Sequence, residues 1–311
     1  MLRFAVRRLL QFIPTILAIS LIMFVLLNVL PGNAALMAAG AQDRGLDPRF
    51  VEQMRKQWDL DKPLHVRYVR YVRNLAHGDL GLSFLRREPV SALILARFWP
   101  TLRLALAAMI IAVSIGLPLG VLSALHQGSW LDAFSMVGAV SGVSMPQFWL
   151  GLLLMFFLSV KVHLLPTSGY GEGGFPYLIL PALTLGAGYM ALLARTTRAA
   201  VLEILSADYV RTAQAKGLPE ILIHRKHVFR NALILVLTTA GLQFGALIGQ
   251  TVIVEKLFSW PGIGSLLVDT IFQRDIPVVQ GCVLLIIVIF LVVNLTVDLL
   301  YALIDPRIEY Q

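Results

Sequence analysis

The stretch that decides the fold is DYVRTAQAKGLPEILIHRKHVFRNA, from Asp208 to Ala232. It is a basic island between two runs, 173–194 and 231–254, that contain no Asp, Glu, Lys or Arg. The interval 195–230 carries seven Lys and Arg. These charges would be very costly among membrane spans but cost little at a cytoplasmic face. We therefore predict a helical platform on the inner membrane face that serves as a docking site.

Charge is missing from most of the chain in blocks. The 311 residues are 58% hydrophobic and only 14% charged, whereas a soluble domain carries about 25% charged residues. A helix needs about 20 apolar residues to cross the hydrocarbon core. We predict an all-α polytopic membrane protein with six transmembrane helices, against the alternative of a soluble protein with six buried helices. One helix is expected in each uncharged run: 9–42, 104–131, 133–160, 173–194, 231–254 and 276–297.

The N-terminus, MLRFAVRR followed by a long apolar stretch, superficially matches a secretory signal. The apolar core of such a signal is about 7–15 residues long, and this stretch is longer. We therefore expect an uncleaved first span, with cleavage near AAGAQ at 38–42 as the alternative.

The distribution of Lys and Arg predicts the orientation. With the N-terminus inside, the cytoplasmic segments hold eleven Lys and Arg, whereas the short external loops hold three. Cations concentrate on the cytoplasmic side, so both termini are expected there. This topology also accounts for the net charge of +8, and no nucleic-acid partner is predicted.

Six spans divide the chain into four parts. The external segment between the first two spans is expected to contain two helices, Asp47–Leu60 and His65–Gly78. Its Lys and Arg do not count against the predicted orientation, because long segments cross the membrane largely regardless of their charge. The predicted parts are a first transmembrane helix at 1–30, the external segment at 31–98, a five-helix core at 99–304 that includes the cytoplasmic loop 195–232, and a cytoplasmic tail at 305–311.

The cytoplasmic loop predicts two short helices joined at a glycine. Ser206 is the expected N-cap, Asp208 suits the first turn, and Gly217 ends the first helix. Small residues at Thr212, Ala213 and Ala215 would let this helix enter a groove closely. The alternative is a loop that lies on the bilayer, with its basic residues against anionic lipid.

Polar and helix-breaking residues within the apolar runs predict a pathway. Pro118 and Pro146 are expected to kink or break the second and third spans. Gln147, Gln243 and Gln250 are predicted to face a central passage, because polar groups within a membrane are candidates for function.

The motif RTAQAKG, at 211–217, resembles the signature loop of ABC importer permeases, and most closely the branch that transports dipeptides, oligopeptides and nickel. Arg211, Thr212 and Ala213 stand where the general signature has E-A-A, and Gly217 is kept. The later I-x-L-P part does not match, and the peptide and nickel branch departs in the same way. Further segments resemble this branch in order: MLRFAVRRLLQFIPT, LPGN, GDLGLS, GVSMPQFW, LLPTSGYG, SADYVRTAQAKGLPE, FRNAL, IVEKLFSWPGIGSLLVD, RDIPVVQ and DLLYALIDPRIEY.

The resemblance implies a bacterial inner-membrane permease that works with other subunits. Two permease subunits would form the path, two ATPase subunits would dock from the cytoplasm, and a periplasmic or lipid-anchored binding protein would deliver the substrate. The ATPase-coupling helix would use Ser206, Asp208, Tyr209, Thr212, Ala213, Lys216 and Gly217. The external turn at Trp260, Pro261, Gly262 and Gly264 would contact the binding protein or plug the outer mouth.

The resemblance leaves the substrate open. Di- or oligopeptides are the first expectation, and nickel or glutathione are the alternatives. No lysine directly follows a glycine, so the chain lacks the loop that cradles nucleotide phosphates. ATP and Mg²⁺ are therefore expected on partner subunits, with no enzyme activity, cofactor or metal site in this chain. A stand-alone secondary transporter or channel, or a membrane scaffold, is the rival from a different class.

Overall fold

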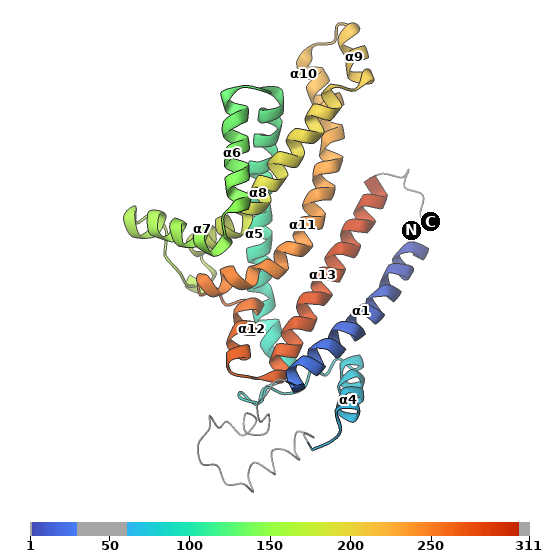
Figure 1. Cartoon of the computed structure of the whole chain (residues 1–311), viewed down its shortest axis with the longest axis vertical. Coiled ribbons are helices and arrows are strands. Elements are labelled where there is room, and N and C mark those ends of the chain that lie inside the picture. The colour runs from blue at the N-terminus through green and yellow to red at the C-terminus, as the bar shows by residue number, and fades with distance from the viewer. Residues whose placement is uncertain (1, 30–60, 305–311) are drawn as a thin grey trace. The chain divides into compact units, whose positions relative to one another are not determined.

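The computed structural model describes residues 2–29 and 61–304, and all of the long elements in these ranges are helices (Figure 1). Within these ranges, five helices are long and apolar enough to cross a membrane, and a bent pair of helices supplies a sixth candidate span. The five are α1 (Leu2–Val29), α5 (Val90–Leu125), α8 (Phe175–Leu205), α11 (Arg230–Leu257) and α13 (Ile276–Ile304). The prediction of an all-α polytopic membrane protein is confirmed.

The shorter elements lie between these spans. They are α4 (Leu64–Ala76), α6 (Trp130–Ser144), α7 (Gln147–Leu154), η1 (Met155–Lys161), η2 (Gly171–Gly173), α9 (Asp208–Ala215), α10 (Glu220–Leu222), η3 (Ile223–Phe229) and α12 (Ile263–Phe272). The predicted external helix at His65–Gly78 corresponds to α4. The predicted helix at Asp47–Leu60 and the tail at 305–311 lie outside the described residues.

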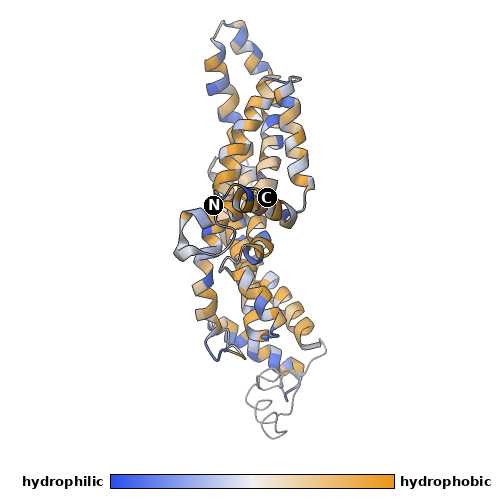
Figure 2. Cartoon of the chain, turned by 90° about the vertical axis from the view of Figure 1, so that its left-hand side faces the viewer, coloured by the Kyte–Doolittle hydropathy of each residue, from blue (hydrophilic) through white to orange (hydrophobic). Residues whose placement is uncertain are grey.

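Hydrophobic residues predominate along the long helices (Figure 2). Many of these side chains are exposed, among them Leu10, Ile22 and Ile110, which are all more than half exposed. Helices that are apolar on most of their surface suit a lipid environment, because lipid tails cover the outward side chains.

The chain divides into two compact units. One unit comprises Met1–Thr101 and Pro261–Leu291, and the other comprises Leu102–Trp260 and Val292–Gln311. In the first unit, α5, α12 and α13 share a core that includes Val90, Ile94, Ile263, Val278 and Cys282. A Cβ on Gly281 would lie 2.6 Å from Val90 Cγ1, so only glycine permits this approach of α13 to α5.

The first unit also holds α4 against α1. The Tyr68 and Tyr71 rings of α4 lie 5.3 and 6.0 Å from the Phe24 ring of α1. The Tyr68 and Ser20 hydroxyls are 3.1 Å apart. The Arg67 guanidinium stacks over Phe24 at 5.8 Å, which is a cation–π contact. The aromatic face of α4 is therefore the face that docks onto the first span.

In the second unit, α8 packs along both α6 and α11. It also lies very close to α5, because Cβ atoms on Gly116 and Gly120 would fall 2.5 Å from the carbonyl oxygens of Met190 and Ala194. Two glycines four residues apart let membrane helices approach at backbone distance. Pro118 lies between them but does not end α5, which is helical from Val90 to Leu125. The chain does not break there, and a kink at Pro118 stays a prediction.

The break predicted at Pro146 is confirmed. α6 ends at Ser144, α7 begins at Gln147, and the chain bends by 110° between Trp130–Ser144 and Gln147–Lys161. Proline favours an extended conformation in the residue before it, and Met145 has φ −80° and ψ 128°. The uncharged run at 133–160 therefore forms two helices with a sharp bend between them, rather than one continuous span.

Candidate coupling surface and translocation path

The predicted coupling helix is present as α9. Its C-terminus is defined by Gly217, which has φ +73° and donates its N–H to the Gln214 carbonyl at 2.9 Å. Glycine adopts this left-handed conformation without strain. Asp208 lies in the first turn, where a carboxylate interacts favourably with the helix dipole.

The predicted N-cap of α9 is wrong. Ser206 is the C-cap of α8, and its hydroxyl donates to the Glu203 carbonyl at 2.7 Å. Ala207 stands at the N-cap of α9 and makes no side-chain capping bond. The serine hydroxyl therefore bonds back to the preceding helix, as serine side chains near helix ends frequently do.

One face of α9 packs against its own chain. Val210 and Ala213 are buried in a cluster with residues of α5, α8, η3 and α11, which include Val201, Ile223 and Val228. Ala213 therefore helps to seat α9, and its side chain is not on the outward surface.

The opposite face of α9 is open. Of the predicted coupling residues, those with exposed side chains or backbone are Ser206, Asp208, Tyr209, Thr212, Lys216 and Gly217. α9 lies at the far end of α8 and α11, away from α7 (Figure 1). Beside it, Ile221 of α10 is 78% exposed. A small helix with an exposed polar face and an adjacent apolar side chain is a suitable surface for a protein partner.

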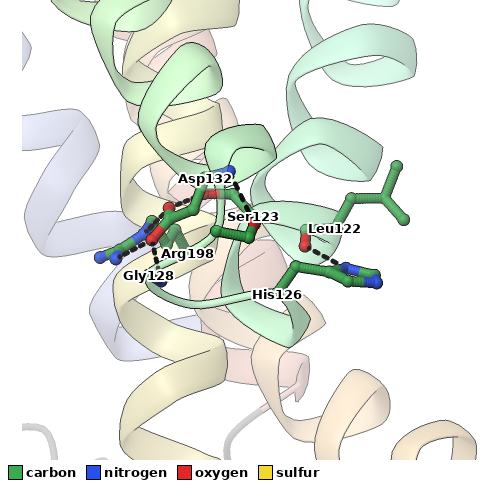
Figure 3. A network of polar contacts seen from close by, with 7 residues as sticks. Leu122, Ser123, His126, Gly128, Asp132 and Arg198 are labelled. Carbon is green, nitrogen blue, oxygen red and sulfur yellow. Dashed lines mark hydrogen bonds and ion pairs between the residues drawn. The ribbon is translucent and has the colours of Figure 1, made fainter.

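A buried carboxylate holds the helix that leads to α9. Asp132, at the start of α6, accepts two hydrogen bonds from Arg198 of α8, at 2.7 Å from Nε and 2.8 Å from the terminal nitrogen (Figure 3). It also accepts from the Ser123 hydroxyl of α5 and from the Gly128 N–H at 3.0 Å. Bidentate pairing fixes the orientation of both side chains, so this network joins α5, α6 and α8.

The Asp132–Arg198 network was not predicted, although the sequence contains a signal. Asp132 is the only Asp, Glu, Lys or Arg between residues 104 and 160. An isolated charge between two apolar runs requires a partner. The partner is 66 residues away, and only the fold identifies it.

The structure brings together two of the three predicted path residues. Gln147, at the start of α7, donates from Nε2 to the Gln250 Oε1 of α11 at 3.4 Å and to the Leu185 carbonyl of α8 at 3.4 Å. Gln243 lies two turns before Gln250 on the same face of α11. The break at Pro146 places Gln147 at this position, because it starts a new helix there.

The predicted outer-mouth turn is largely buried. Trp260 is 0% exposed and packs edge-on against Tyr170, with ring centroids 4.7 Å apart. Gly262 precedes α12, Gly264 lies in its first turn, and both are buried. Pro261 is half-buried and Ser259 is exposed. Contact between this turn and a binding protein stays a prediction.

Two family descriptions match the chain in succession. Residues 116–310 match the "Binding-protein-dependent transport system inner membrane component", and residues 1–105 match the N-terminal part of such membrane components. Together with the helical fold, these matches define a non-catalytic, multi-pass permease subunit of an ABC importer in the inner membrane. The chain belongs to the binding-protein-dependent transport system inner membrane component family.

Two named relatives match the whole length of the chain. The glutathione transport system permease protein GsiC of Escherichia coli (strain K12) is 45% identical over 311 residues, which cover 100% of both chains. The protein of the same name from Salmonella paratyphi A is also 45% identical over the same length. The chain is therefore an ABC importer permease of the peptide and nickel branch, with glutathione permeases among its relatives.

Solved structures support the fold. A chain of the MetNI methionine ABC transporter, in an inward-facing conformation, matches with a TM-score of 0.59 and 20% identity, covering 70% of this chain and 99% of that one. A chain of an amino acid ABC transporter matches with a TM-score of 0.50 and 18% identity, covering 70% and 95%. At these identities the likeness is one of fold alone.

Proposed function

We propose that this chain forms half of the translocation path of an ATP-driven importer for glutathione or a similarly short peptide. A second, homologous permease subunit supplies the other half. A binding protein delivers the substrate from outside, and both termini of the chain lie in the cytoplasm. Two ATPase subunits bind ATP and Mg²⁺, and this chain carries no cofactor of its own.

The observation that carries the proposal is the geometry of α9. This helix is anchored by Val210 and Ala213 and exposes Tyr209, Thr212 and Lys216. An anchored helix with a free outer face can be moved as a rigid element by a partner. α8 continues from α9 into the membrane, and Arg198 ties it to Asp132. Movement of α9 is thereby passed to α5 and α6.

The relatives favour glutathione over the di- and oligopeptides that the sequence suggested first. Glutathione is a tripeptide with two carboxylates and two amide groups. Carboxamide side chains donate hydrogen bonds to carboxylates and pair with amides, so Gln147 and Gln250 suit such a substrate. Nickel is supported only by the branch resemblance.

Competition between substrates tests the proposal. The complete transporter, with its ATPases and binding protein, is reconstituted in proteoliposomes, and ATP-dependent uptake of labelled glutathione is measured. We expect saturable uptake, with unlabelled dialanine competing at least about tenfold more weakly than unlabelled glutathione. Stronger competition by dialanine or Ni²⁺ than by glutathione would contradict the assignment of the substrate.

The glutamine pair should affect transport directly. Removing both side chains, in Gln147→Ala/Gln250→Ala, deletes two hydrogen-bonding groups of about 0.5–1.5 kcal/mol each. We expect the rate of glutathione uptake to fall about tenfold, with basal ATPase activity unchanged. The same uptake in wild type and in a triple variant that adds Gln243→Ala, at normal expression, would refute a role in the path.

A further inference from the structure

Two motifs without an assigned role, GDLGLS and RDIPVVQ, meet at one carboxylate. Asp275 is 2% exposed and accepts hydrogen bonds from the Ser83 hydroxyl at 2.5 Å and the Phe84 N–H at 3.0 Å. The Leu85 N–H lies 3.4 Å from the same carboxylate. Charged hydrogen bonds from buried donors are among the stronger ones in proteins. Asp275 therefore holds a turn that is 190 residues away in the sequence.

The turn is a tight hairpin. Leu82 pairs with Pro89 in an antiparallel bridge, and the Ser83 N–H donates to the Glu88 carbonyl at 2.9 Å. Phe84 is buried. Leu85, Arg86 and Arg87 form the tip and are exposed. The Arg86 N–H donates to the Ser83 hydroxyl at 2.9 Å, so Ser83 connects the tip to Asp275.

Asp275 also belongs to a second exposed turn, between α12 and α13. Its N–H donates to the Thr270 carbonyl at 2.9 Å. The residue before it, Arg274, is exposed and has φ +55°. Phe272 in the same turn is 82% exposed. One buried carboxylate thus fixes two turns next to each other, and each presents arginine and a large apolar side chain.

The two turns together form a surface that is basic and apolar. Three arginines, Arg86, Arg87 and Arg274, stand against one exposed glutamate, Glu88. Arginine and aromatic residues are enriched in protein interfaces and contribute most to their affinity. Both turns lie in segments that the proposed topology places outside the cell.

We propose that this surface, formed by Leu85, Arg86, Arg87, Phe272 and Arg274, is where an acidic edge of the external binding protein docks. The inference rests on the proposed function, in which such a protein delivers the substrate. Long, adaptable cationic side chains reach lipid headgroups by themselves, so anchoring to lipid does not require a fixed backbone. Here the backbone of both turns is held by one buried carboxylate, which preorganises the surface for a partner of defined shape.

Charge reversal tests the site. The complete transporter, in nanodiscs of neutral lipid, is titrated with its own binding protein, and ATPase stimulation is measured. For Arg86→Glu/Arg274→Glu we expect the half-saturating concentration of binding protein to rise about tenfold, with basal ATPase activity unchanged, and the difference to shrink as salt rises. The matched control is Arg70→Glu/Arg73→Glu on α4, with the same charge change, for which we expect less than about a twofold rise.

The possible outcomes distinguish failure of the docking surface from failure of the proposed function. If the binding protein stimulates wild type and both double variants at equal concentrations, the docking surface is refuted while the proposed function stands. If it does not stimulate wild type, both fall. If Arg86→Glu/Arg274→Glu behaves as wild type in neutral nanodiscs and differs only in vesicles of anionic lipid, the surface binds headgroups and the proposal is wrong.

Cross-linking tests the apolar part independently. A photoreactive phenylalanine analogue at position 272 is expected to cross-link to the purified binding protein. The same analogue at position 134, where Phe134 of α6 is 75% exposed, is expected not to do so. Equal cross-linking from both positions, or none from 272, would contradict the proposal.

Discussion

Replacing Thr212 by tryptophan is expected to lower ATP-dependent uptake at least about a hundredfold. Thr212 is exposed on α9, and its hydroxyl bonds only within the helix, to the Asp208 carbonyl at 2.8 Å. We therefore expect the larger side chain to leave the fold of the permease intact but to prevent α9 from fitting closely against an ATPase, as the proposed function requires. Loss of a central interface contact costs about 2–4 kcal/mol, and about 2.7 kcal/mol is a hundredfold in affinity. Uptake and ATPase co-purification are measured together.

The control for this variant is Glu203→Trp. Glu203 is also exposed, near the C-terminal end of α8 but outside α9. We expect it to retain uptake and its ATPase subunits. Uptake by Thr212→Trp within about twofold of wild type would show that α9 is not the element onto which the ATPase docks.

Breaking the Asp132–Arg198 pair is expected to destabilise the permease and lower uptake together. Arg198→Gln leaves the carboxylate with only Ser123 and Gly128 as partners, and Asp132→Asn leaves the guanidinium without its bidentate acceptor. Removing one partner of this partly buried pair leaves the other charge without its counter-charge, which is more damaging than removing both. We expect each single variant to lower the melting temperature of the purified complex by about 5 °C. The double variant should be no worse than the more damaging single one.

Arg195→Gln is the matched control for Arg198→Gln. Arg195 lies three residues earlier on α8 and is exposed, so its loss should leave the melting temperature within about 1 °C of wild type. Equal melting temperatures for Arg195→Gln and Arg198→Gln, or additive losses in the double variant, would show that the pair does not hold α5, α6 and α8 together.

The features predicted correctly from the sequence are those that depend on local physics. The apolar runs predicted the spans because length and hydrophobicity alone decide membrane crossing. Gly217 predicted the end of α9 because glycine adopts the left-handed conformation that ends a helix without strain. Pro146 predicted the bend because proline disfavours a helical conformation in the residue before it. Pro118 does not end a helix: α5 continues through it, and Gly116 and Gly120 on either side pack against α8.

The features that sequence reasoning missed depend on distant partners. Ala213 was expected on the docking face, but the cluster with Ile223 and Val228 buries it. Asp132 and Asp275 were not assigned any role, because Arg198 and Ser83 lie 66 and 192 residues away from them. A buried carboxylate requires donors, but the sequence does not identify which donors the fold supplies.

Cross-linking tests most directly whether α9 docks onto an ATPase subunit in the cytoplasm, on which the proposed function depends. Cys282, the only cysteine, is buried, so Thr212→Cys in a Cys282→Ser background carries a single accessible thiol. We predict that this thiol forms a cross-link to an ATPase subunit of the assembled transporter and is protected from membrane-impermeant maleimide added outside intact cells. Labelling of Cys at this position from the outside, with no cross-link to the ATPase, would contradict the account.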